Sequence, residues 1–198
     1  MMSLLIVILS YLVGSIPTSY LAGKWLKGID LRQHGSGNVG ATNVARVIGR
    51  KAAAAVLAID ILKGFLPVKA AEFWLGKDFI GPLAGFAAIC GHNWSIFLRF
   101  AGGKGVATTA GVFTALAPLA TAMAASVFFI VAGITKYVSA GSICSALALC
   151  LSCLLLKSPL PVAVFAGVAC AFIIYRHWQN IERLLKGTEN RWNQSRKE

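Results

Sequence analysis

A glycine-rich segment, residues 35–43, holds the first groups in the chain that could do chemistry. Gly35, Gly37 and Gly40 can adopt positive φ, which lets successive backbone N–H groups turn toward one point. The residues between and after these glycines add side-chain donors without negative charge; they are Ser36, Asn38, Thr42 and Asn43. Arg46 follows closely and supplies a positive charge. This combination predicts a loop that binds a phosphate group.

A second glycine-rich turn, residues 102–105, presents the ammonium group of Lys104. Because we expect a helix to begin here, the helix N-terminus and the lysine would both favour an anion. Anchoring to anionic lipid is the alternative. His92 precedes this turn and has two equal interpretations, as a site residue or as a structural histidine at a membrane boundary, where the nearby Trp94 is typical.

His177 and Asn180 form a third polar cluster, near the end of the chain. Their i, i+3 spacing places them on one face of a helix. A neutral imidazole can accept a proton, or donate a hydrogen bond to a phosphate or hydroxyl group. A structural histidine at the membrane interface is the alternative. Ser142 adds a hydroxyl group, although small serine residues also serve helix packing.

Asp60 and Lys63 lie inside an apolar run. Charges within a membrane segment are costly and suggest a function. At i, i+3 the two side chains can also neutralise each other as a structural bridge. We favour the bridge, with Lys63 facing the site as the alternative.

Two known phosphate-binding motifs are excluded by their context. The glycines of residues 35–40 match the dinucleotide-binding string, but that motif needs a preceding strand, and the neighbours here are apolar helices. Gly103 and Lys104 resemble the end of a Walker A motif. However, Leu98 and Gly105 stand where that motif needs Gly and Ser or Thr.

Composition identifies the kind of protein that must position these residues. Of 198 residues, 57% are hydrophobic and 13% charged, against about 25% charged in soluble domains. We therefore predict an all-α integral membrane protein. The net charge of +12 sits in short clusters between apolar runs, which favours anionic lipid and substrates over nucleic acid. The cysteines all lie in apolar runs, so we expect no disulfide and no metal site.

The apolar runs predict about seven transmembrane helices. They are residues 1–23, 52–68, 79–98, 105–117, 119–135, 138–156 and 159–175. The run 105–135 exceeds the roughly 20 residues that one span needs, and Pro118 should divide it. Five spans plus a re-entrant pair at Pro118 is the alternative. The first run lacks a basic segment and a cleavage site, so it predicts a retained span.

Charge predicts the orientation. Fifteen of the 19 Lys and Arg residues fall on one set of loops. By the positive-inside rule the N-terminus is outside, and the C-terminus is cytoplasmic together with all three polar clusters. We expect residues 1–198 to form a single polytopic membrane domain.

Together, the motifs resemble those of the PlsY family, the bacterial membrane acylphosphate:glycerol-3-phosphate acyltransferases. The matching runs are residues 36–43, 60–64, 91–94, 102–107 and 175–177, with Asn180, Arg183, Gly187 and Glu189. They occur in order over almost the whole chain. Two departures lie away from the expected chemistry: Lys136 replaces a common Arg, and residues 140–141 are Ala-Gly where Leu-Ala is usual.

The resemblance implies transfer of a fatty acyl group from acyl phosphate to the 1-hydroxyl of glycerol 3-phosphate. The products are 1-acyl-glycerol 3-phosphate (lysophosphatidic acid) and phosphate. This is the first acylation of bacterial phospholipid synthesis, at the cytoplasmic membrane, and it needs no metal or other cofactor. Expected partners are both substrates and membrane lipid, with no nucleic acid, and we expect a monomer.

The expected site has three groups of residues. Catalytic roles fall to Lys104, His177, Asn180 and Arg46. The phosphate-binding loop contains Ser36, Gly37, Asn38, Gly40, Ala41, Thr42 and Asn43. Supporting residues are Lys63, His92, Gly103, Ser142 and Glu189. With no evident protein nucleophile, we expect no acyl-enzyme, and positioning and electrostatics supply the rate. A substrate phosphate oxygen is our first choice of proton acceptor, ahead of His177.

Two rival functions were weighed. A transporter of a phosphorylated metabolite would also need a basic, glycine-rich site, but transporters usually show internal repeats and a midplane site. A CDP-alcohol phosphotransferase needs clustered aspartates, whereas Asp30, Asp60 and Asp78 are far apart.

Overall fold

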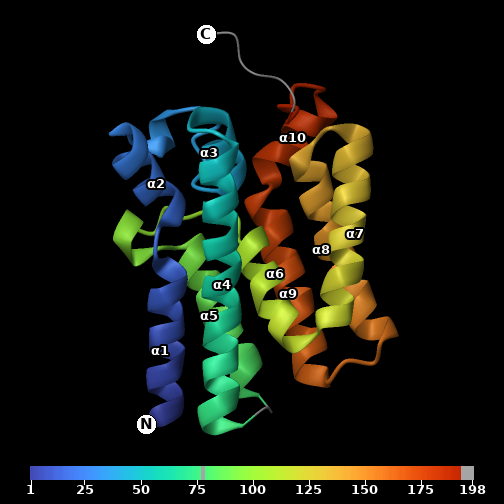
Figure 1. The fold of residues 1–198 in the computed structure, drawn as a ribbon. Coiled ribbons are helices and arrows are strands. Elements are labelled where there is room, and N and C mark those ends of the chain that lie inside the picture. Colours follow the sequence, from blue (N-terminus) through green and yellow to red (C-terminus); the bar gives the residue numbers. More distant parts are fainter. Residues whose placement is uncertain (77–78, 193–198) are drawn as a thin grey trace. The chain divides into compact units, whose positions relative to one another are not determined.

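The computed structural model describes residues 1–76 and 79–192, and every regular element in them is a helix (Figure 1). The chain divides into two compact units, Met1–Leu116 and Ala117–Glu198, each of which is described by itself. The all-helical prediction is confirmed, and the single domain stays a prediction.

The described residues of the first unit form six α-helices and two short 3-10 helices. They are α1 (Met2–Ser15), α2 (Thr18–Lys27), η1 (Leu31–Gln33), α3 (Ala41–Val47), α4 (Arg50–Leu75), α5 (Ile80–Asn93), η2 (Ile96–Leu98) and α6 (Val106–Leu116). Helix α4 packs against α1, α5 and α6, and α1 packs along α5. The predicted phosphate-binding residues lie in the loop before α3 and in the first turn of that helix, and Lys104 lies in the loop before α6.

Small residues bring these helices together at backbone distance. A Cβ atom on Gly14 of α1 would collide with the backbone of Ala88 in α5. In the same way, a Cβ atom on Gly111 of α6 would collide with the carbonyl of Ile61 in α4. Such close approach is typical of membrane helices, which associate through packing of small residues rather than through exclusion of water.

The helix formed by the first apolar run is interrupted, and a buried ion pair bonds to the backbone at the interruption. Helix α1 ends before Ile16 and Pro17, and α2 begins at Thr18, so the predicted span over residues 1–23 is interrupted in the structure and extends to Lys27. Proline has no N–H group and cannot continue the hydrogen-bond ladder. The Lys63 ammonium donates to the Ile16 carbonyl at 2.9 Å and pairs with Asp60 at 2.8 Å. Asp60 also accepts from the Thr18 hydroxyl at 2.6 Å, which supports the structural interpretation of the pair.

The second unit consists of α7 (Pro118–Thr135), α8 (Val138–Leu155), α9 (Leu160–Arg176) and α10 (Trp178–Leu185). Helix α8 packs against both α7 and α9. Helices α9 and α10 are bent by 58° at His177. All five cysteines of the chain lie among the described residues and are free, and two of them, Cys150 and Cys153, share α8 at a Cys-x-x-Cys spacing.

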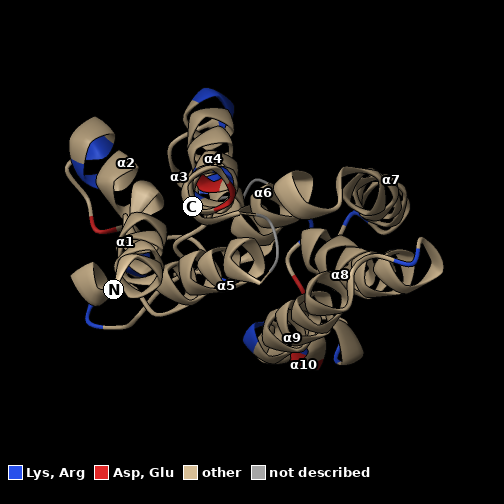
Figure 2. Ribbon diagram, turned by 90° about the horizontal axis from the view of Figure 1, so that it is seen from below, with Lys and Arg blue, Asp and Glu red and all other residues tan. Residues whose placement is uncertain are grey.

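Three segments of the described chain are long and apolar enough to cross a membrane: Met2–Lys27, Pro118–Thr135 and Val138–Leu155. The bent pair α9–α10 would make a fourth. Helices α5 and α6 have 14 and 11 residues, shorter than the roughly 20 that a span needs. Most of the ribbon is uncharged (Figure 2). The predicted division at Pro118 is confirmed, whereas the count of seven and the orientation stay predictions.

The predicted span 79–98 is shorter in the structure. Helix α5 ends at Asn93, and the chain then forms η2. The Trp94 N–H donates to the Cys90 carbonyl at 2.8 Å and completes the last turn of α5. The Ser95 hydroxyl donates to the Ser15 carbonyl of α1 at 2.5 Å. These bonds direct the following loop back toward the end of α5.

The Asp60–Lys63 pair should be a large contributor to stability. Asp60→Leu leaves the Lys63 ammonium buried without its counter-charge and should lower the free energy of unfolding by about 3–5 kcal/mol. Thermal unfolding in detergent measures this as a lower Tm. The double variant Asp60→Leu/Lys63→Met should lose less than the single variant, because no charge remains unpaired.

Lys186→Met is the matched control, since it breaks the exposed pair between Lys186 and Glu182. An exposed i, i+4 pair contributes about 0.3–0.5 kcal/mol. If Asp60→Leu unfolds at the same temperature as this control, the buried pair does not hold the helix break.

Candidate active site

The side chain of Asn43 organises the glycine-rich loop from within. It is buried, and its Oδ1 accepts from the Ser36 N–H at 2.9 Å. Its amide nitrogen donates to the carbonyls of Leu31 at 3.3 Å and His34 at 3.0 Å. Both ends of the amide are therefore used inside the loop. The phosphate-binding role predicted for this side chain stays untested, and the geometry gives Asn43 a shaping role.

Glycine is required at two positions of this loop. Gly35 and Gly37 have φ of 63° and 70°, in the left-handed region that favours glycine. A Cβ atom on Gly35 would also overlap the Asn43 side chain. On Gly37, a Cβ atom would lie 3.0 Å from the Arg32 carbonyl. The loop can therefore close around Asn43 only with these two glycines.

The backbone of the same loop offers a run of donors. In the part of the chain that the structure describes, the N–H groups of residues 38–42 donate to no protein acceptor. Gly40, Ala41 and Thr42 lie here, half-buried, at the start of α3. Consecutive unbonded N–H groups form a concave site that suits an anion.

The loop that carries Lys104 lies directly on the end of α5. The N–H of Gly102 donates to the Asn93 carbonyl at 3.2 Å, and that of Gly103 to the His92 carbonyl at 3.0 Å. A Cβ atom on Gly103 would collide with the His92 ring and lie 2.8 Å from the Val39 carbonyl. The first two predicted clusters are thus in contact within the first unit.

His92 and Lys63 both lie near the buried carboxylate of Asp60. His92 is buried, and its Nδ1 is 3.9 Å from that carboxylate. Lys63 is also buried and bonds to Asp60 and Ile16. The supporting role of both residues stays a prediction. Lys104 is half-buried in its loop, and Arg46 is exposed on α3.

In the second unit, a buried carboxylate gathers the polar residues. Glu189 Oε1 accepts from the Ser139 hydroxyl at 2.9 Å and from the Asn180 amide at 2.7 Å. Its Oε2 pairs with Arg183 Nε at 2.7 Å. Burial alone would raise the pKa of Glu189. The hydrogen bonds from Arg183, Asn180 and Ser139, with the charge of Arg183, outweigh burial and hold the pKa below its usual value.

His177 has a defined orientation at the bend between α9 and α10. Its Nδ1 lies 2.7 Å from the Ile173 carbonyl, which can only accept, so Nδ1 carries the proton. In the neutral ring the lone pair is then on Nε2. The His177 carbonyl accepts from the Asn180 N–H at 2.8 Å, so the two predicted residues are held together.

Ser142 and Ser139 of the second unit have different contacts. The Ser142 hydroxyl donates to the Val138 carbonyl of its own helix at 2.9 Å, which is typical of a packing serine. Ser139, absent from the expected site, contacts Glu189 instead. The sequence gives little indication of the contact between Ser139 and Glu189, because the two residues are 50 positions apart.

Each unit therefore contains a polar cluster of its own. The first has a run of backbone donors beside a lysine loop, which suits a phosphate group. The second has an oriented imidazole beside an amide whose position is set by a buried carboxylate. This inventory, with many donors and an oriented imidazole, fits chemistry on phosphorylated substrates.

Comparison with known proteins extends these observations. Residues 4–187 match the family model described as glycerol-3-phosphate acyltransferase. A glycerol-3-phosphate acyltransferase of Thermoanaerobacter sp. (strain X514) is 41% identical over 194 residues, covering 98% of each chain. Glycerol-3-phosphate acyltransferase 2 of Moorella thermoacetica is 47% identical over 190 residues, covering 96% of this chain and 97% of the relative.

Two solved structures of PlsY (YgiH), an integral membrane glycerol 3-phosphate acyltransferase, are also similar. The glycerol 3-phosphate form has a TM-score of 0.93 and 42% identity, covering 96% of both chains. The lysophosphatidic acid form has a TM-score of 0.88 and 41% identity, covering 96% of this chain and 95% of the other. The chain therefore belongs to the glycerol-3-phosphate acyltransferase family, and it is an integral membrane enzyme of that family.

Proposed function

We propose that this enzyme transfers a fatty acyl group from acyl phosphate to the 1-hydroxyl of glycerol 3-phosphate. The observation that carries the proposal is the run of unbonded N–H groups at residues 38–42 beside the Lys104 loop. Relatives described as bound to glycerol 3-phosphate and to lysophosphatidic acid support the acceptor and the product.

The proposed reaction is direct. The 1-hydroxyl oxygen attacks the acyl carbonyl carbon, a new ester bond forms, and the bond between that carbon and the phosphate oxygen breaks. Inorganic phosphate leaves with the electron pair. The hydroxyl proton passes to a substrate phosphate oxygen or to His177. No acyl-enzyme forms, and no cofactor takes part.

Binding falls mainly to the first unit. The N–H groups of residues 38–42, within the loop 37–43, hold the acyl-phosphate head group, with Ser36 and Thr42 adding side-chain donors. Arg46 and Lys104 neutralise phosphate charge as the leaving group develops, which stabilises the transition state. Asn43 keeps the loop in shape through its bonds to residues 31–36.

Orientation of glycerol 3-phosphate falls to the second unit. His177 and Asn180 contact this substrate, and Glu189 sets the direction of the Asn180 amide. Holding the two reactants at the right angle supplies much of the rate. We place the site at the cytoplasmic face of the bacterial cytoplasmic membrane, in a monomer with seven spans and its N-terminus outside.

The first test is an assay of purified protein with palmitoyl phosphate and glycerol 3-phosphate, with a chelator present. Release of phosphate together with lysophosphatidic acid is expected, because phosphate is the proposed leaving group. Palmitoyl-CoA in place of palmitoyl phosphate should give no product. Lack of product with either donor would contradict the proposal.

Lys104→Ala tests the role of this lysine in the same assay, with Lys186→Ala as the control. Loss of the ammonium group should raise KM and lower turnover, whereas Lys186→Ala, on an exposed surface, should leave both unchanged. Normal kinetics in Lys104→Ala would remove Lys104 from the site. A chain that moves glycerol 3-phosphate across proteoliposomes without making product would instead be a transporter.

His177→Ala should lower kcat by about 100-fold at unchanged folding, the usual size of a general acid–base contribution. His177→Gln keeps a hydrogen-bond donor and should recover part of this loss if the residue orients the substrate. His34→Ala removes an exposed histidine and is the matched control. Turnover near wild type in His177→Ala would show that His177 has no chemical role.

Glu189 predicts a pH dependence of stability. Because its pKa is lower in the folded protein than the usual value of about 4.3, its contribution is present above that value. The contribution is lost as the pH falls through the lower, folded pKa. At pH 7, Glu189→Gln should lower the free energy of unfolding by about 2 kcal/mol, since a charged hydrogen-bond acceptor is removed.

Thermal unfolding of wild type and Glu189→Gln from pH 7 down to pH 3 measures this effect. The difference in Tm should shrink toward the acid end. Glu182→Gln, at an exposed carboxylate, is the control and should show little difference at any pH. A difference for Glu189→Gln that stays constant with pH would rule out a role for its charge.

A further inference from the structure

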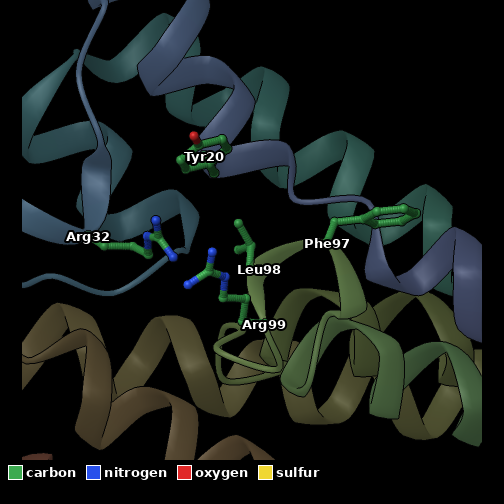
Figure 3. A pocket seen from close by; sticks show the side chains of 5 residues that line it. All are labelled: Tyr20, Arg32, Phe97, Leu98 and Arg99. Carbon is green, nitrogen blue, oxygen red and sulfur yellow. The ribbon is translucent and has the colours of Figure 1, made fainter.

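A cavity of about 340 Å³ opens in the first unit between α2, η1 and the η2 loop. It is lined by Tyr20, Arg32, Phe97, Leu98 and Arg99. Figure 3 shows the guanidinium groups of Arg32 and Arg99 pointing toward one another while the Phe97 ring points away. No lining residue is acidic, and none belongs to the site proposed above.

Arg32 is held in place at this cavity. The Asp30 carboxylate accepts from its Nε at 3.0 Å and from its Nη2 at 2.6 Å. The guanidinium carbon lies 5.4 Å from the centroid of the Tyr20 ring, a cation–π contact. Among the described residues, nothing bonds to Nη1. Arg32 is therefore fixed and still has donors to offer.

Arg99 has no such compensation. In the described part of the chain it forms no ion pair. Arg99 and Phe100 both have positive φ, 54° and 63°, which is unfavourable for residues with side chains. Residues held in such conformations cluster at functional sites. The Asp30 carboxylate pairs with Arg32, so the positive charge of Arg99 at the cavity is not balanced.

The surroundings indicate where an anion would come from. Ile96, Phe97 and Phe100 on the η2 loop and Trp25 and Leu26 on α2 are exposed. In a membrane protein, exposed aromatic side chains next to arginine and lysine are typical of the lipid–water interface. Arginine binds phosphate through parallel N–H bonds. An occupant with both a phosphate and acyl chains fits both features.

We propose that this cavity binds the phosphodiester head group of an anionic membrane phospholipid. Arg32 and Arg99 hold the phosphate oxygens, and the acyl chains extend past the exposed side chains of the η2 loop. The carbonyl of Arg32 adjoins Gly37 of the glycine-rich loop, and Arg99 leads into the Lys104 loop. The lipid is thus a ligand that contacts the supports of both loops without being a substrate.

Native mass spectrometry of the delipidated protein with palmitoyl-oleoyl phosphatidylglycerol tests this site. Wild type should retain one tightly bound lipid, and the zwitterionic phosphatidylcholine should not replace it. Arg99→Gln should weaken phosphatidylglycerol binding at least about fivefold, the usual contribution of one basic residue near an anionic membrane surface. Arg32→Gln should do the same, and Arg99→Lys should keep part of the affinity.

Lys27→Gln is the matched control, because it removes the same charge from an exposed position on α2 outside the cavity. Equal phosphatidylglycerol binding by wild type and both arginine variants would overturn the proposal. So would Arg99-dependent binding of glycerol 3-phosphate or inorganic phosphate without any lipid, which would make this a site for soluble phosphate. Acyl transfer by Arg99→Gln in neutral detergent should stay within about twofold of wild type, which separates this proposal from the proposed reaction.

Discussion

A backbone carbonyl inside a membrane must find a donor within the protein, because the bilayer core has no water to supply one. The break at Ile16 and Pro17 creates this problem at the junction of α1 and α2. Lys63 and Asp60 solve it from the neighbouring helix, one by donating to Ile16 and the other by accepting from Thr18. Helix α2 can then follow α1 across the break, and the chain after α2 forms the glycine-rich loop. His92, near the same carboxylate, extends this support to the Lys104 loop.

Backbone contacts at glycines fix the positions of the helices and loops in the first unit. The two loops meet where Gly103 lies against the Val39 carbonyl and the His92 ring, and the helices below meet at Gly14 and Gly111. At each point a methyl group would force the backbones apart. Because packed interiors tolerate little displacement, such contacts transmit helix positions directly to the loops. In the second unit a side chain performs this task instead, as Glu189 holds Asn180.

Helix boundaries could be predicted from the sequence better than the contacts between side chains. Pro118 marked the division between α6 and α7, and the spacing of Asp60 and Lys63 indicated a bridge. Pro17 interrupts a helix as Pro118 does, but the long uncharged run around Pro17 favoured a single uninterrupted span. The role of Asn43 was beyond prediction, since an amide in a glycine-rich loop can serve a ligand or the loop equally well. The Ser139–Glu189 contact depends on how α8 meets the chain after α10, which spacing does not reveal.

The location of Glu189 has a consequence for folding. Its carboxylate accepts from Ser139 on α8 and from Asn180 and Arg183 on α10, so these helices and the segment after α10 must come together before the cluster is complete. Until then the Asn180 amide and the Arg183 guanidinium lack their shared acceptor. The polar cluster therefore reports the tertiary packing of the second unit rather than the formation of its individual helices.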